Sequence, residues 1–332
     1  MNYSQLSKHR SELMGMAIIG ILFCHFKECL VIHQKTVPIY ADLLSRGICG
    51  VDIFMVLSGI GLYYSFVNDK NILNFYKKRF FRLIPVYFII GGTYWLISDI
   101  LIDHVKFSLF LEDLFLLSFF RKGTSTFWYI PASIIFYFLF PFLYYYLTNS
   151  RIMIGISIGW KTFFLIIIAI VCDYLLSRSF PVYRNIAIMT GRFPAFVLGI
   201  YFGDKSYRNC HCSIGELLLL PIVKVILHYL IKIPAFEQWL EKINVHYLDT
   251  LLALLVIEAF LLFVNLVDRK ELRNVLKWYG NITLEVYLLH MSLLSLFRHP
   301  ADAGIYFFVC AVIPSAGGYF IHKVIKSGLK SV

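Results

Sequence analysis

The chain has 332 residues, of which 59% are hydrophobic, 17% aromatic and only 15% charged. Soluble domains carry about 25% charged residues, so this chain has too few charges to cover the surface of a soluble globule. The apolar content also excludes a disordered chain. The net charge of +11 would suggest nucleic acid in a soluble protein. In a chain this apolar it instead indicates basic loops beside a membrane and sites for anionic ligands, and no nucleic-acid partner is expected.

The long apolar runs predict an all-α, polytopic transmembrane bundle of about ten spans, because about 20 apolar residues cross a bilayer as a helix. A single transmembrane domain is expected over residues 1–332. The segment 107–120 is apolar but short and contains Glu112 and Asp113, so it is interpreted as an interfacial or re-entrant piece. The predicted spans are 13–32, 47–67, 83–101, 127–147, 163–177, 186–203, 216–231, 248–266, 281–297 and 304–322.

The distribution of basic residues predicts the orientation of these spans. With the N-terminus in the cytoplasm, the inner segments hold 18 Lys and Arg residues and the outer segments hold 11. Because basic residues gather on cytoplasmic loops, we expect both termini inside and a multi-pass protein of the cytoplasmic membrane, in contact with its lipids. The longest outer connection, about 102–126, is the candidate for a substrate-facing element.

Three ionisable residues are predicted to lie near the middle of the membrane, where such groups are rare and costly. At about 1.5 Å per helical residue, His25 lies roughly 18 Å, His290 roughly 14 Å and Asp52 roughly 22 Å from the inner edge. A carboxylate beside an imidazole can orient the ring for general-base catalysis. The alternative is that each histidine only bonds to a neighbouring backbone group or hydroxyl.

A basic cluster precedes the third span, in the sequence FYKKRFFRLIP. Arg79 and Arg82 are three residues apart, so they share one helical face, and Arg10 precedes the first span on the same side of the membrane. Arginine binds phosphate with a planar fork of donors, which indicates a cytoplasmic anion site. The alternative is a topological anchor that holds the segment inside.

Further polar residues lie within later spans. Helical spacing places Tyr287 and His290 on one face of the ninth span together with Thr283, and Glu285 on another face, where it is available to a cation of a neighbouring helix. Arg192 lies inside the sixth span, where it needs a partner such as an anionic ligand or a carboxylate, with Glu258 and Asp173 as candidates.

Aromatic and metal-binding patterns give weaker signals. Trp128 and Tyr129 at the outer end of the fourth span are typical of an interfacial belt, with a sugar platform as the alternative. The Cys210, His211, Cys212 sequence does not have zinc-ligand spacing, so no metal site is expected.

Several stretches, in order along nearly the whole chain, resemble the bacterial membrane acyltransferase family 3, which O-acylates cell-surface sugars. They are RSELMGMAIIGILFCHF, GVDIFMVLSGIGLYYS, FYKKRFFRLIPVY, FWYIPASIIFYFLFP, GRFPAFVLGIYFG and WYGNITLEVYLLH. Each is short and apolar, but the ordered set is specific.

The resemblance implies a bundle of about ten helices that takes acyl groups, usually acetyl, from cytoplasmic acyl-CoA. By this resemblance His25 matches the essential first-helix histidine of the family, and Arg79 and Arg82 match its basic pair. Asp52 lies in the matching GVD segment. Tyr287 and His290 match the late YLLH segment.

The chain departs from the family at one position. Many members have an arginine about ten residues before the histidine, where this chain has Met14. Arg10, one helical turn earlier, is the candidate substitute.

We therefore expect an O-acyltransferase that acts on a surface polysaccharide or a lipid-linked glycan, with acetyl-CoA or another acyl-CoA as the donor. The phosphates of the donor would bind Arg79, Arg82 and Arg10. His25, oriented by Asp52, would act as general base or transient acyl acceptor, and Tyr287 and His290 would stabilise the oxyanion.

No tightly bound cofactor is expected, and a protein partner is left open. The alternative function is a transporter or exporter, because carriers also place ionisable residues at the midplane.

Overall fold

The computed structural model describes residues 2–32, 41–124, 126–149, 155–180, 182–213, 222, 233, 246–267, 269–297 and 302–328. Within these ranges the chain is helical and forms no β-strand, apart from an isolated bridge between Asn2 and His211. The predicted all-α class is confirmed.

Eight helical segments of the described chain are long and apolar enough to cross a membrane. Some are continuous helices, and others join two or three helical elements without a break in the chain. Their elements are α2 (Arg10–Ile32), α3 (Ala41–Ser45) with η1 (Arg46–Cys49) and α4 (Gly50–Asn68), α5 (Ile72–Trp95) with η2 (Leu96–Ile102), α8 (Tyr129–Thr148), α9 (Ile158–Ser179), α10 (Tyr183–Thr190) with α11 (Phe193–Tyr207), α14 (His246–Leu266), and α17 (Ala303–Phe307) with η3 (Phe308–Val312) and α18 (Ile313–Gly328).

Most predicted spans coincide with these segments, and two need comment. The predicted span 281–297 is α16 (Thr283–Leu296), an apolar helix of only 14 residues. The predicted span 216–231 lies outside the described residues, apart from residue 222.

The remaining helices are short or amphipathic: α1 (Ser4–Lys8), α6 (Phe107–Leu114), α7 (Leu117–Lys122) and α15 (Lys270–Asn281). Between α6 and α7, Leu116 adopts a left-handed conformation with φ of 62°, which ends one helix and starts the next. The segment 107–120 is therefore not an additional span, in agreement with its interpretation as an interfacial or re-entrant piece.

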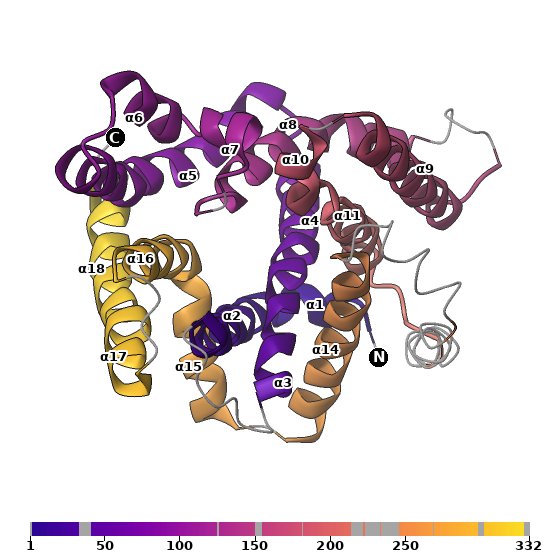
Figure 1. Cartoon of the computed structure of the whole chain (residues 1–332). Helices are drawn as coiled ribbons and strands as arrows, with labels where there is room; N and C mark the ends of the chain where they lie inside the picture. The colour runs from indigo at the N-terminus through magenta and orange to yellow at the C-terminus, as the bar shows by residue number, and fades with distance from the viewer. Residues whose placement is uncertain are drawn as a thin grey trace.

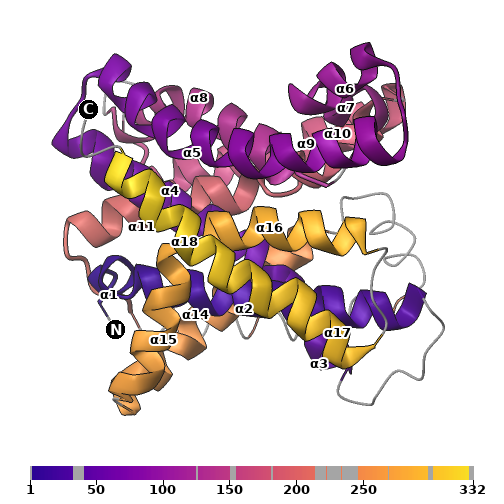
Figure 2. The same ribbon diagram turned by 90° about the vertical axis from the view of Figure 1, so that its left-hand side faces the viewer.

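The helix α4 lies at the centre of the bundle and packs along α11 on one side and α2 on another, while α15 packs on α2 and α16 on α18. Figure 1 views the bundle almost along α2, and Figure 2 shows it from the side. In Figure 2 the N-terminus with α1 and the C-terminal end of α18 lie at the same end of the bundle. The opposite end carries α3, α17 and the start of α6.

Close contact between α2 and α15 depends on glycine. A Cβ atom built on Gly15 would overlap the carbonyl oxygen of Leu276, and one built on Gly280 would overlap that of Ser11. Small residues let helix backbones approach, which matters in a membrane where apolar burial gives little drive to associate. These glycines bring α16, which follows α15, beside α2.

Candidate active site

A cavity of about 250 Å³ runs through the bundle beside α2. One face of α2 forms its wall, because the lining residues of this helix are three, four or seven positions apart. They are Arg10, Met14, Ile21, His25 and Glu28. The other walls come from η1, α4, α5, α8, α10, α14 and α16, together with Trp128 and Arg192 at helix N-caps.

At one end of the cavity three arginines from two helices come together, as predicted. Arg10 approaches from α2, and its Nε donates to the carbonyl oxygen of Leu57, 3.0 Å away. Its guanidinium lies over Gly61, where a Cβ atom would stand 2.6 Å from Nη2. Arg79 and Arg82 approach from α5 and are close enough to Arg10 for their charges to interact.

None of these three arginines has a carboxylate partner among the described residues. The Nε of Arg79 is buried without a hydrogen-bond partner within the same ranges. The neighbouring Lys78 differs, because its Nζ lies 2.9 Å from Asp69 and its hydrogen bond lowers the pKa of that exposed carboxyl. This end of the cavity therefore holds positive charge without a carboxylate partner in the described part of the chain, together with free donors, which suit a phosphorylated ligand.

His25 lies in the same wall, further along α2. Its Nδ1 is 2.7 Å from Oε2 of Glu28, one helical turn later. The His25 side chain is 17% exposed and that of Glu28 is 48% exposed. The carboxylate accepts from Nδ1, so the neutral ring presents Nε2 as a base. The sequence predicted that a carboxylate orients His25, and one does, but it is Glu28 and not Asp52.

Asp52 does not orient His25, and this prediction is wrong. One oxygen of Asp52 forms an ion pair with Nη1 of Arg192, and the other accepts from Thr250 Oγ1 at 2.8 Å. Asp52 is completely buried, as is Arg192. Two buried opposite charges gain more from each other than from a neutral imidazole, which explains the choice of partner.

His290 lies beside His25, with the two ring centroids 5.3 Å apart, so the prediction that their depths match is correct. Its Nδ1 donates to the carbonyl oxygen of Cys310 at 2.7 Å. His290 is fully buried and is not part of the cavity wall. It therefore contacts the His25 ring without itself lining the cavity.

Tyr287 and Thr283 line the cavity on α16, as their helical spacing predicted. The Tyr287 hydroxyl lies 3.4 Å from the carbonyl oxygen of Thr126, a long hydrogen bond that a better acceptor can replace. Its ring packs against that of Tyr129, with centroids 5.5 Å apart.

Glu285 lies on the other face of α16 and bonds to Nδ1 of His322 at 2.8 Å. It therefore serves as a partner for a neighbouring helix and takes no part in the cavity.

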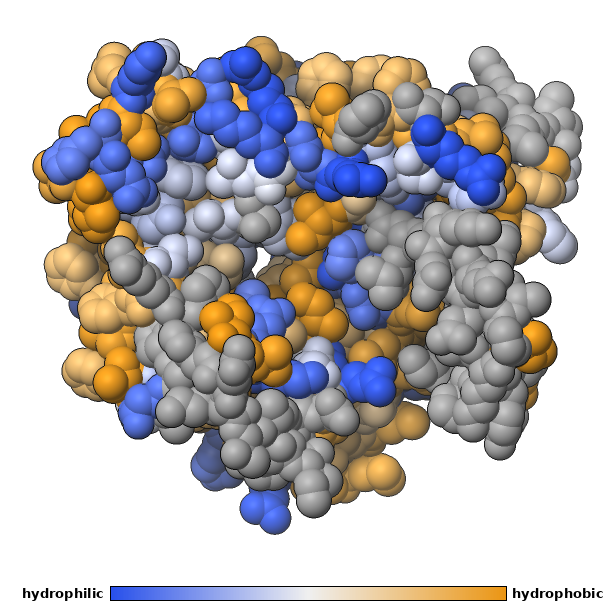
Figure 3. All heavy atoms as spheres, in the orientation of Figure 1, coloured by the Kyte–Doolittle hydropathy of each residue, from blue (hydrophilic) through white to orange (hydrophobic). Residues whose placement is uncertain are grey.

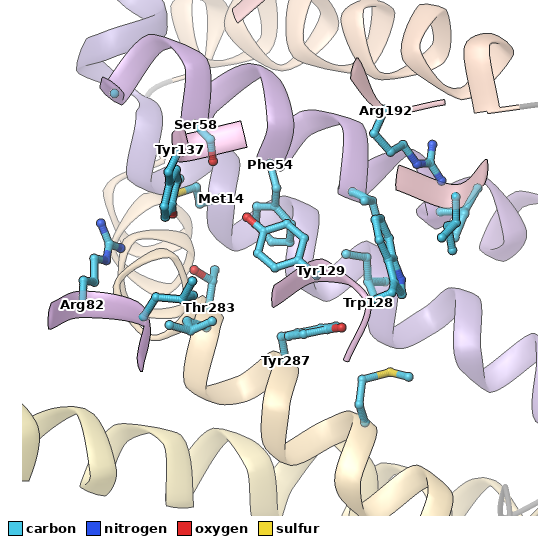
Figure 4. Close-up of a pocket in the computed structure, with 18 of the residues that line it drawn as sticks. Met14, Phe54, Ser58, Arg82, Trp128, Tyr129, Tyr137, Arg192, Thr283 and Tyr287 are labelled. Carbon is cyan, nitrogen blue, oxygen red and sulfur yellow. The ribbon is translucent and has the colours of Figure 1, made fainter. Parts of the chain in front are cut away.

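Arg192 lies at the end of the cavity away from Arg82, and Trp128 lies beside that end (Figure 4). The candidate partners of Arg192, Glu258 and Asp173, are wrong: it pairs with Asp52 and, at 3.2 Å, with Asp249. Trp128 is only 8% exposed, so it belongs to the cavity wall and not to an interfacial belt.

Two functional candidates were missed from the sequence. Glu28 is three residues after His25, so the spacing on one helix could have identified it. Asp249 lies on α14, far from Arg192 along the chain, and no local pattern could have paired them.

The comparison with protein-family models assigns the chain to a family. The family model of the acyltransferase domain, acyltransferase family 3, matches residues 13–322. No curated protein and no solved structure matches the chain significantly. The family match covers nearly all of the chain, including every element that lines the cavity. The chain therefore belongs to the membrane acyltransferase family 3.

Proposed function

We propose that this protein is an integral-membrane O-acyltransferase that moves an acyl group, acetyl in the simplest case, from cytoplasmic acyl-CoA to a hydroxyl of a surface polysaccharide or lipid-linked glycan. One observation carries the proposal: three arginines that have no carboxylate partner among the described residues line a single cavity with the His25–Glu28 pair. Arg10 and His25 are fifteen residues apart on α2, which is about 22 Å along the helix. An extended acyl-CoA could therefore bind with its phosphates at the arginines and its thioester at His25.

The inner end would bind the phosphates of the donor. Arg10, Arg79 and Arg82 supply planar donors without a carboxylate partner in the described part of the chain. Charge-assisted hydrogen bonds to phosphate are about twice as strong as neutral ones. Arg10 would thus take the place of the family arginine that is missing at Met14, because both residues lie on the cavity face of α2.

At the other end, His25 would act as general base. Its Nε2 removes the proton of the acceptor hydroxyl while the hydroxyl oxygen attacks the thioester carbonyl carbon. The carbon–sulfur bond then breaks, and His25 returns the proton to the leaving thiolate. Glu28 holds the ring and stabilises the imidazolium that forms. The Tyr287 hydroxyl is the candidate donor to the developing oxyanion.

We place the protein in the cytoplasmic membrane as a multi-pass protein, with both termini and the arginine cluster inside. The basic loops and the common end of the two termini in Figure 2 support this orientation. A cysteine replacing Asn74, at the exposed start of α5, should resist impermeant thiol reagents in intact cells and react after lysis. Ready labelling of that cysteine in intact cells would contradict both the orientation and the donor route.

The reaction itself is tested with purified protein in lipid nanodiscs, radiolabelled acetyl-CoA and an alkyl glycoside as acceptor. An acyltransferase should release free CoA thiol and label the glycoside in equal amounts. A transporter, the alternative, should do neither. Loss of glycan acetylation in cells that lack the gene would then identify the natural acceptor. Purified protein that neither binds nor consumes acetyl-CoA would overturn the proposal.

A further inference from the structure

We propose that Trp128, Arg192, His246 and Asp249 form the acceptor subsite of this cavity, and that it takes an uncharged sugar ring. The inference rests on the proposed function, because it names the class of acceptor for that reaction. It depends on two buried guanidinium nitrogens of Arg192 without a partner among the described residues, an aromatic wall and the balance of charge around them.

Arg192 supplies free donors. Its side chain is fully buried and lines the cavity, and only Nη1 is engaged, by Asp52 and Asp249. The Nε and Nη2 atoms are buried without a partner among the described residues. Buried N–H groups without an acceptor are costly, so a ligand that supplies hydroxyl oxygens would be stabilised here.

Trp128 supplies a flat apolar face. It lies at the N-terminus of α8, and the preceding Phe127 is only 2% exposed. These two residues therefore carry both rings into the bundle. In Figure 4 Trp128 and Arg192 lie at one end of the cavity and Arg82 at the other. A pyranose can stack the C–H groups of one face on the indole ring of Trp128. Its hydroxyl groups then extend from the edge of the sugar ring toward polar side chains such as Arg192, where they can form hydrogen bonds.

The charges favour an uncharged ring. The guanidinium of Arg192 already faces the carboxylates of Asp52 and Asp249, and Nδ1 of His246 lies 3.2 Å from Asp249. No positive charge is left over for a sugar carboxylate. The inner end differs, since its three arginines have no carboxylate among the described residues. The two ends of one cavity thus suit an anionic donor and a neutral acceptor respectively.

This subsite also lies toward the predicted outer side. Figure 3 shows the end of the bundle opposite α1, with hydrophilic side chains mainly in the upper part of this face and a hollow near its centre. His246 begins α14 at this end, since the other end of that helix reaches Gln5 of α1 through Asn265. A glycan could approach from outside while acyl-CoA enters from inside.

The test measures equilibrium binding of two radiolabelled probes to the full chain in nanodiscs, with empty nanodiscs subtracted. Octyl β-D-glucoside and octyl β-D-glucuronide differ only in a hydroxymethyl or carboxylate group on the ring. We expect the glucoside to bind about 10- to 100-fold more tightly, from like-charge repulsion at an effective dielectric constant of 20. Equal binding, or tighter binding of the glucuronide, would overturn the proposal.

Two variants separate the contributions. Asp249→Asn keeps the shape of the side chain but removes a negative charge, so it should narrow the preference for the glucoside by raising glucuronide binding. Trp128→Ala should weaken glucoside binding about tenfold through loss of the aromatic face. Trp160→Ala, at an exposed tryptophan of α9 outside the cavity, is the matched control and should bind as the unmodified protein does. If Trp128→Ala fails to insert into the membrane, the binding data for Asp249→Asn still test the proposed subsite.

Acetyl-CoA binding measured on the same samples distinguishes the two proposals. If acetyl-CoA binds but the glucoside preference is absent or survives Asp249→Asn unchanged, the acceptor subsite is wrong and the acyltransferase remains. If the glucoside preference is present but the protein never consumes acetyl-CoA, the subsite stands as a sugar site and the proposed function fails.

Discussion

The proposed role of Glu28 leads to the sharpest prediction. Glu28→Gln keeps nearly the same volume and leaves the amide oxygen free to accept from Nδ1 of His25, but it removes the charge. The loss of charge should lower the rate of acyl transfer, because the imidazolium formed when His25 takes the proton no longer faces a carboxylate. Binding of acetyl-CoA should be unaffected, since the donor phosphates would lie near the arginines at the other end of α2.

The structure sets the expected size of this loss. A hydrogen bond to a charged group contributes about 1.5–3 kcal/mol to stability, compared with about 1 kcal/mol for a neutral one. The His25–Glu28 distance of 2.7 Å is that of a strong bond, but the Glu28 side chain is 48% exposed, so water competes for the carboxylate. The low to middle part of that range therefore applies. The loss is the difference between this bond and the neutral one that glutamine keeps, roughly 0.5–1.3 kcal/mol. Since each 1.36 kcal/mol of activation free energy is tenfold in rate, turnover should fall about 2- to 10-fold.

The assay is initial-rate transfer from radiolabelled acetyl-CoA to octyl β-D-glucoside at saturating donor. Glu258→Gln is the matched control, because this carboxyl lies on α14 and does not line the cavity. It should transfer at the unmodified rate. Transfer by Glu28→Gln within twofold of the unmodified protein would show that Glu28 does not orient His25, and the proposed dyad would be wrong.

Three further predictions test other parts of the site and the bundle. His25→Gln should still bind acetyl-CoA but lose about 10²–10⁴-fold in transfer rate, the usual contribution of a general base; a near-normal rate would reduce His25 to a structural residue. The double variant Arg79→Ala, Arg82→Ala should weaken acetyl-CoA binding by about 10-fold or more for each lost charge-assisted bond, measured by equilibrium binding, and Lys at both positions should restore it only in part because a point charge lacks the planar fork. Unchanged binding would leave the pair as a topological anchor. Gly15→Ala should lower the thermal stability of the detergent-solubilised protein by about 1–3 kcal/mol, since its methyl group would overlap the carbonyl oxygen of Leu276, and an unchanged melting temperature would mean that α2 and α15 separate freely.

Several features of the candidate site could be predicted from the sequence because they depend on position along a single helix. His25 and His290 were placed at similar depth by counting residues, and their rings lie 5.3 Å apart. Arg79 and Arg82 share a face of α5 through their spacing, and both line the cavity. The pairing of Glu28 with His25 could have been predicted in the same way, since Glu28 lies one helical turn after His25 on α2.

The partners of Asp52 could not be predicted in the same way. Depth along a helix is one coordinate, and Asp52 lies at a depth from which both His25 and Arg192 are plausible partners. The rotation of α4 against α11 and α14 turns its carboxylate toward Arg192 and Thr250. Glycines contribute to this packing, since a Cβ atom on Gly59 would stand 2.6 Å from the carbonyl oxygen of Phe196.

The amino-acid sequence by itself determined the all-α class and most of the long apolar helices, because hydropathy and helical rise act locally along the chain. The tertiary structure alone decided that Asp52 and Asp249 neutralise Arg192, and that Trp128 faces the cavity and not the membrane surface. These are contacts between helices distant in sequence. Their choice depends on which faces pack together, and among mostly apolar helices in a lipid environment the apolar residues do not specify a single pairing.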